Sequence, residues 1–146
     1  MINHLNNVLL EGVLVTKPEI VARSKEEDEG KYVLAKTRLV TDRYYVDKKG
    51  QSQVESLYID IQMWGNLAEM AVKSMDKGMT CRIVGRLKMC SWEVENGEKR
   101  RTYEIVASHV EFKRQKNGKK AEEKIVLEDK EHEGDKVTEK EVEYII

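Results

Sequence analysis

Apolar and polar residues alternate along five stretches of the first 112 residues, a pattern that is typical of β-strands with one buried face. These stretches are rich in Val, Ile, Leu, Thr and Tyr, which fit the pleated surface of a sheet. They cover residues 5–15, 32–41, 57–64, 79–89 and 102–112. Turn sequences separate them, because Lys48-Lys49-Gly50 follows the second stretch and Asn96-Gly97 precedes the fifth.

One segment between the third and fourth strands has a different period. Residues 66–75 place apolar side chains at positions 67, 68, 71, 72 and 75, which is a helical spacing. We expect Asn66 to cap the start of this helix and Gly78 to mark its approximate end. Five strands with one short helix between the third and fourth predict an all-β fold, a five-stranded OB-fold barrel.

The charge of the chain changes the picture once it is divided by segment. The whole chain of 146 residues has a net charge of -1, which by itself argues against a nucleic-acid partner. Residues 1–112 are neutral, residues 113–124 carry a net +4, and residues 125–146 carry a net -5. Residues 113–146 hold one aromatic residue, Tyr144, and no sustained apolar period. The sequence therefore predicts an OB-fold domain over 1–112 and a flexible charged tail over 113–146, basic at first and then acidic.

Several classes of protein are disfavoured. No apolar run approaches the ~18 residues that span a membrane, and the N-terminus has no signal-peptide core, so we expect a cytoplasmic, nucleoid-associated protein. We expect Cys81 to be a small core residue and Cys90 to be exposed. The three His residues do not cluster in sequence and no Cys-x-x-Cys is present, which predicts no metal and no cofactor. No nucleophile or phosphate-binding motif is found, so no enzyme is expected, although some OB-fold nucleases use scattered carboxylates.

The polar faces of the predicted strands combine aromatic and basic residues. In the fourth strand the odd positions from Cys81 to Met89 form a core face, and the even positions are basic and lead to Trp92. In the third strand Tyr58 and Trp64 share the polar face. One interpretation is that these aromatic residues cover a second small core. The other, which the interleaved cations favour, is a stacking platform for a single-stranded nucleic acid.

The order and spacing of several short segments resemble the bacterial-type single-stranded DNA-binding protein family. The resemblance covers about residues 6–112. It is carried by 6–14 (NNVLLEGVL), 61–69 (IQMWGNLAE), 84–87 (VGRL) and 103–107 (YEIVA). It implies an OB-fold, a homotetramer, and binding of single-stranded DNA in replication, recombination and repair.

The resemblance also implies the stacking residues. Trp64, Tyr58 and Trp92 match aromatic positions of the family, and the fourth falls at Tyr44 or Tyr45, between which the alignment does not choose. Two features depart from the family. Asn66 stands where the family often has Lys, so one phosphate contact is missing. The end of the chain has an acidic run and the partner-binding tip Glu143, Tyr144, Ile145 and Ile146, but no Pro-Phe.

The leading hypothesis is a binder of single-stranded DNA without base specificity, which has no catalytic residues and recruits replication and repair proteins through its tail. Bases are expected to stack on the aromatic residues, and phosphates to follow Lys36, Arg38, Arg86, Lys88, Arg100 and Arg101. The alternative is an OB-fold module that docks proteins of a replisome or primosome assembly without binding DNA strongly.

Overall fold

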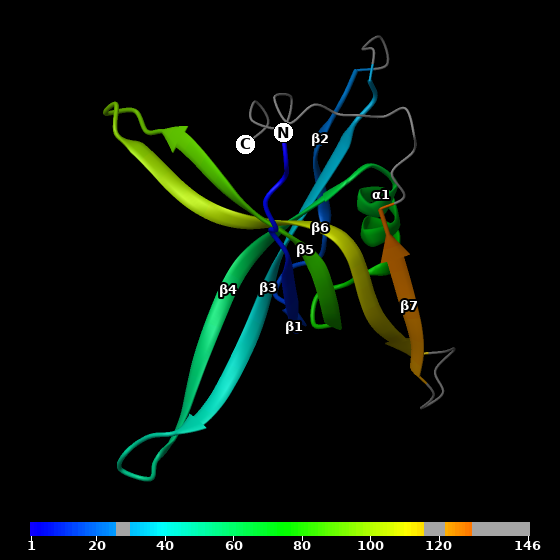
Figure 1. Ribbon diagram of the computed structural model, residues 1–146. Coiled ribbons are helices and arrows are strands. Elements are labelled where there is room, and N and C mark those ends of the chain that lie inside the picture. The colour runs from blue at the N-terminus through cyan, green and yellow to red at the C-terminus, as the bar shows by residue number, and fades with distance from the viewer. Residues whose placement is uncertain (26–29, 116–121, 130–146) are drawn as a thin grey trace.

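The computed structural model describes residues 1–25, 30–115 and 122–129, which form one sheet and one helix (Figure 1). The strands are β1 (Val8–Leu14), β2 (Glu19–Arg23), β3 (Val33–Val46), β4 (Ser52–Trp64), β5 (Thr80–Glu93), β6 (Lys99–Gln115) and β7 (Glu122–Glu128). The helix α1 (Gly65–Ser74) lies between β4 and β5.

Five of the strands close into a barrel. The sheet runs β1-β5-β6-β4-β3, and β1 also pairs with β3, so that the two ends of this order meet. The buried apolar side chains, among them Leu39, Ile61, Ile83, Ile105 and Val110, form one core inside it. The predicted five-stranded OB-fold barrel with a single short helix between its third and fourth strands is therefore confirmed.

Two glycines allow strands to cross closely at this closure. A Cβ atom built on Gly12 would lie 2.2 Å from the carbonyl oxygen of Val40, and one on Gly85 would lie 2.2 Å from that of Val106. Both neighbours are backbone atoms, which cannot move aside without disturbing a strand. Only residues without a side chain fit where β1 approaches β3 and β5 approaches β6.

The helix begins differently from the sequence prediction. Its N-cap residue is Trp64 in extended conformation, and no side chain caps it, so the prediction that Asn66 is the cap is wrong. Gly65, with a φ of 60°, makes the sharp turn from β4 into the helix. Leu67, Ala68 and Ala71 face the core, and the chain returns to extended conformation at Met75.

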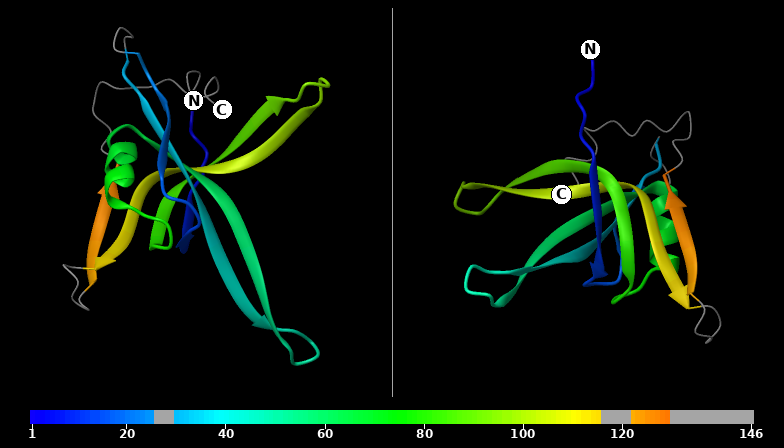
Figure 2. Two further views of the ribbon diagram at one scale, coloured as in Figure 1. Left: turned by 180° about the vertical axis from the view of Figure 1, so that it is seen from behind. Right: turned by 60° about the horizontal axis from the view of Figure 1, so that its bottom comes forward.

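The strands extend further than the alternation predicted, and two of the hairpins project from the barrel as arms. Beyond Val40 and Tyr58 the β3–β4 hairpin has no third strand, and we call residues 41–57 the β3–β4 arm. Residues 89–103 likewise form the β5–β6 arm. The two arms point in different directions from the barrel (Figures 1 and 2). Their loops contain the two predicted turns, with Gly50 and Gly97 at positive φ.

Two strands were not predicted. β2 is a short strand on the edge of β3. β6 continues to Gln115 and β7 lies within residues 113–146, so the prediction of a flexible tail from residue 113 is wrong for 113–115 and 122–128. Its Ile125 and Leu127 stand opposite Phe112 and Val110, and Leu127 is buried, whereas Val126 between them is exposed. This run is too short to give a sustained apolar period, but pairing with β6 buries it.

An ion pair and the polar contacts of a histidine connect β7 to β6 on the outside of the barrel. Lys124 Nζ lies 3.1 Å from Glu111, and His109 Nε2 lies 3.0 Å from the same carboxylate. The second ring nitrogen of His109, Nδ1, lies 3.0 Å from Glu128 on β7. The hydrogen bonds from His109 and Lys124 lower the pKa of Glu111 below its ordinary value.

We predict that Glu111→Gln lowers the midpoint of thermal unfolding at neutral pH. Since the folded pKa of Glu111 is below the unfolded value of 4.5, its stabilisation is complete above that value and is lost as the pH falls through the folded pKa. The two proteins should therefore unfold at similar temperatures at about pH 2.5. Circular dichroism melts at both pH values measure this, with Glu19→Gln on β2 as a control. Equal midpoints at neutral pH would contradict it.

Candidate nucleic-acid interface

Over part of their length, the register of four strands places the even-numbered residues on one face. Leu34 is opposite Trp64, and the pairing of β3 with β4 continues without a shift to Val46 and Ser52. Asp60 is in register with Glu104 of β6, which is in register with Lys88 of β5. We call this surface the outer face: the even positions 34–44, 54–64, 86–92 and 100–106. The odd-numbered residues of the same strands lie on the opposite face. They point into the core within the barrel and lie on the continuation of that face in the arms.

The outer face brings together the aromatic residues that the sequence singled out. Tyr58 and Trp92 are exposed and Trp64 is half-buried. Trp64 is the last residue of β4, directly before α1. Trp92 is on the β5–β6 arm opposite Arg100. The register also separates the two tyrosines between which the sequence could not choose. Tyr44 lies on the outer face with 77% of its surface exposed, opposite Val54.

Tyr45 has the opposite parity and a different neighbour. It stands opposite Gln53 on the other face of the β3–β4 arm. The guanidinium carbon of Arg43 lies 5.0 Å from the centre of its ring, a cation–π contact. The geometry therefore groups Tyr44, and not Tyr45, with Tyr58 and Trp64.

One aromatic residue of this surface was missed by the sequence analysis. Tyr32 precedes β3, and its ring lies 6.3 Å from the Trp64 ring, tilted by 57°. It has the even parity of the outer face and sits two residues before Leu34, the partner of Trp64. The same alternation that identified Lys36 and Arg38 reaches Tyr32 when it is extended backwards along the chain.

Two of the expected phosphate contacts are already ion-paired. Arg38 Nε lies 2.8 Å from Asp60, and this pair raises the pKa of the guanidinium. Lys36 Nζ lies 3.0 Å from Glu104. In register, Arg38, Asp60, Glu104 and Lys88 form a row across β3, β4, β6 and β5, so that cations flank two central carboxylates. The alternation along each strand identified these cations, but it did not identify Asp60 and Glu104 as their ion-pair partners.

The remaining predicted cations divide between the two faces. Arg86, Lys88 and Arg100 are on the outer face by register. Arg101 stands opposite Ser91 and has the opposite parity, so the structure does not bring it together with the others. Arg86, Arg100 and Arg101 are exposed, whereas Lys88 is partly buried.

A small buried polar cluster lies under the centre of the outer face. Gln62 is fully buried, Glu104 is 2% exposed and Cys90 is 4% exposed. The Gln62 amide nitrogen donates to Glu104 Oε1 at 3.2 Å and to Cys90 Sγ at 3.6 Å. The prediction that Cys90 is exposed is therefore wrong. Burial and the nearby Glu104 raise the pKa of its thiol.

Cys81 lies in the core, as predicted. It is buried against the interior of the barrel, and desolvation raises the pKa of its thiol to about 12. Both cysteines are free thiols. Neither has the lowered pKa that a nucleophilic cysteine needs.

The core-parity face of the β5–β6 hairpin is apolar but exposed. Leu87 and Met89 were predicted to be core residues, yet they are 41% and 52% exposed. The pairing of β5 with β6 shifts between Val84 and Gly85, and from Met89 onward the hairpin projects from the barrel as the β5–β6 arm. Tyr103, in register with Met89, is also exposed, as is Leu57 on the other arm. These side chains continue the core pattern onto a surface that the barrel does not cover.

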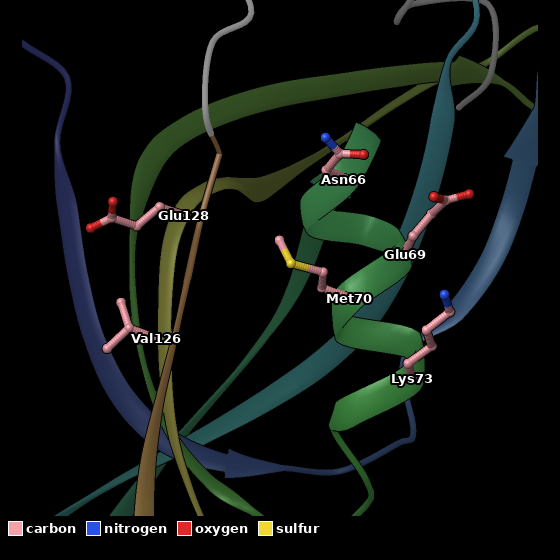
Figure 3. Close-up of a pocket in the computed structure, with 6 residues that line it drawn as sticks. All are labelled: Asn66, Glu69, Met70, Lys73, Val126 and Glu128. Atoms are coloured by element: carbon pink, nitrogen blue, oxygen red, sulfur yellow. The ribbon is translucent and has the colours of Figure 1, made fainter.

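A groove of the described chain lies away from the outer face. A pocket of about 590 Å³ separates α1 from β7, and none of the predicted stacking or phosphate-binding residues lines it. Figure 3 shows its lining side chains on the helix and on β7: Asn66, Glu69, Met70, Lys73, Val126 and Glu128. Asn66, which departs from the family pattern, therefore faces this groove.

Some expectations concern parts of the chain that the structure does not describe. The predicted tip, Glu143 to Ile146, lies outside the described residues. Among the residues that are described, no group of His, Cys, Asp and Glu is arranged to hold a metal ion. The short helix α1 is not of the length and apolar character that a membrane span requires, and no other helix is found in these ranges.

Comparison with known proteins gives consistent matches. Residues 5–113 match the family described as the single-strand binding protein family. Single-stranded DNA-binding protein 3 of Clostridium acetobutylicum is 32% identical over 108 residues, which are 74% of this chain and 70% of that protein. Single-stranded DNA-binding protein 2 of Chlorobaculum tepidum is 28% identical over 127 residues, 86% of this chain and 83% of that protein.

Solved structures share the fold. A single-strand binding protein of Plasmodium falciparum in complex with single-stranded DNA superimposes with a TM-score of 0.63 at 19% identity, over 88% of this chain and 99% of that one. A deletion mutant of the single-stranded DNA-binding protein of Thermus aquaticus gives a TM-score of 0.58 at 24% identity, over 75% and 57% of the two chains.

Proposed function

Because the chain belongs to the single-strand binding protein family, we propose that its outer face binds single-stranded DNA without base specificity and protects it during replication, recombination and repair. The observation that carries this proposal is the register of β3, β4, β6 and β5. It gathers Tyr44, Tyr58, Trp64 and Trp92 on one face together with basic side chains.

The chemistry of this face suits a flexible strand. Every base offers a π-face, so aromatic side chains stack on successive bases whatever their sequence, at about 1–3 kcal/mol per base. Arg86 and Arg100 are exposed beside them and carry charge complementary to phosphate. The same strands present no groove-reading helix, and catalysis is not part of the proposal. The alternative of a protein-docking module is less well supported, because it gives no reason for aromatic residues to share a face with cations.

The charge of the outer face has a further effect on binding. Asp60 and Glu104 already neutralise Arg38 and Lys36, so these cations add less to the affinity than unpaired ones. Counterion release depends on the number of phosphates that are neutralised. We therefore propose that stacking contributes a large share of the binding free energy, beside the phosphate contacts of Lys36, Arg38, Arg86, Lys88 and Arg100.

We predict that Trp64→Ala and Trp92→Ala each weaken binding of oligo-dT by about 1–3 kcal/mol, because each removes a stacking surface. Anisotropy of a labelled oligonucleotide measures the affinity, and quenching of the intrinsic tryptophan fluorescence reports contact with the bases. Duplex DNA of the same length is the control and should bind more weakly. Equal affinity for duplex, or affinity unchanged in both variants, would contradict the proposal.

The two adjacent tyrosines provide a matched pair of variants. We predict that Tyr44→Ala weakens oligo-dT binding, because Tyr44 shares the outer face with Tyr58. Tyr45→Ala should leave the affinity within about twofold of wild type, since its ring faces the other way and packs on Arg43. The same anisotropy titration measures both. A larger loss for Tyr45→Ala than for Tyr44→Ala would show that the chosen face is wrong.

We also propose a homotetramer in which the exposed core-parity side chains of the hairpins are covered by other copies. Light scattering should give four copies of the 17.0 kDa chain. Met89→Lys should lower this mass, because it places a charge in an apolar surface. Val54→Lys, at an exposed apolar residue of the outer face, should not. A monomeric wild-type protein, or equal masses for both variants, would argue against this interface.

The proposal for the chain end rests on sequence alone. Residues 130–146 are acidic and contain the apolar run Tyr144, Ile145 and Ile146. We propose that this tip recruits replication and repair proteins, as the family resemblance implies. The location in the cytoplasm, in association with the nucleoid, stays a prediction.

A further inference from the structure

We propose that Gln62 is a positioning residue that holds the indole of Trp64 in one orientation on the outer face. This inference rests on the proposed binding of single-stranded DNA and concerns how its binding surface is prepared. Gln62 itself is fully buried and therefore acts through Trp64 rather than by touching the nucleic acid.

The hydrogen bonds of Gln62 have a single consistent direction. The indole Nε1 of Trp64 donates to Gln62 Oε1 at 3.3 Å, and Gln62 Nε2 donates to Glu104 Oε1 at 3.2 Å. An indole nitrogen can only donate and an ionised carboxylate can only accept. Turning the amide over would therefore lose both bonds, so its orientation is fixed from both ends.

Lys36 completes the chain of contacts. Its Nζ lies 3.0 Å from the same Glu104 oxygen, which balances the charge of a carboxylate that is almost fully buried. Buried polar groups lower stability unless they are hydrogen-bonded, and apolar residues could fill the same volume without that cost. The series of contacts runs from Lys36 through Glu104 and Gln62 to the Trp64 indole. Of these four residues, only Trp64 is proposed to stack on a base.

A second contact restrains the indole from another side. The ring of Tyr32 lies 6.3 Å from that of Trp64 at an angle of 57°, a tilted aromatic pair. With its nitrogen bound by Gln62 and its ring packed on Tyr32, the indole has little freedom left to lose when a base stacks on it. Such preorganisation raises affinity by reducing the entropy that binding costs.

The test uses Gln62→Leu in a Trp92→Phe background, where Trp64 is the only tryptophan of the chain. Leu removes the acceptor for the indole and keeps an apolar side chain of similar size. We expect the fluorescence anisotropy of Trp64 to fall and the affinity for labelled oligo-dT to weaken about two- to tenfold, the equivalent of one hydrogen bond. If Gln62→Leu fails to fold, Gln62→Met makes the same test, because its unbranched side chain adapts to the site.

A double-mutant cycle separates positioning from a general loss of structure. Phe at position 64 has no N–H, so in a Trp64→Phe background Gln62→Leu should change the affinity by less than about twofold. Thr37→Val is the matched control, because it also removes a buried side-chain hydrogen bond, from Thr37 to the carbonyl of Thr16, but on the core face. It should lower the unfolding temperature without changing oligo-dT affinity or Trp64 anisotropy.

The outcomes distinguish this inference from the proposed function. If the Trp92→Phe protein binds oligo-dT and Gln62→Leu changes neither its affinity nor the Trp64 anisotropy, the positioning role is overturned and DNA binding stands. The positioning role would also be overturned if Gln62→Leu lowered the oligo-dT affinity equally when Trp64 is present and in the Trp64→Phe background. If neither wild type nor the Trp92→Phe protein binds oligo-dT, the proposed function itself fails.

Discussion

A shift of one residue in the pairing of β3 with β4 would turn Trp64 toward the core and Ile61 toward solvent, because side chains alternate strictly along a strand. The interior of the barrel prevents this shift, since it accepts only the apolar set of positions. The same constraint that buries the core thus fixes which residues lie on the outer face. Gly12 and Gly85 allow the close approaches that close the barrel and hold these registers. The candidate interface follows from how the core is packed.

The outer face is not a plain stacking surface. Its centre contains a carboxylate, an amide and a thiol that are almost completely buried, from Glu104, Gln62 and Cys90. Each has a partner, and the charge of Glu104 is balanced by Lys36. The interpretation that aromatic residues cover a second small cluster and the interpretation that they stack on bases are therefore compatible. The indole nitrogen of Trp64 contacts the buried Gln62, and the exposed part of its ring remains for the proposed stacking on a base.

The sequence predicted what depends on local alternation and missed what depends on distant pairing. The barrel strands, the helix and the face of Tyr58 and Trp64 follow from periods of two and 3.6 residues. The burial of Cys90 does not, because it depends on side chains of other strands that cover it. β7 was missed because its apolar run, residues 125–127, is only three residues long and has charged neighbours on both sides, and the burial of Ile125 and Leu127 requires β6. That Tyr44 lies on the outer face and Tyr45 on the other depends on β3 pairing with β4 without a shift as far as Val46.

The two arms are two-stranded ribbons, which have little stability in water without a further layer. One surface of each belongs to the outer face, and the other carries exposed apolar residues such as Leu57 and Met89. In the proposed tetramer, subunit contacts and the proposed DNA binding therefore use opposite sides of the same two-stranded ribbon. Subunit contacts that rigidify one side of a ribbon also reduce the conformational entropy that is lost when a ligand binds to the other side. By thermodynamic linkage, the apparent affinity for a ligand then rises with protein concentration, and a bound ligand favours association of the subunits.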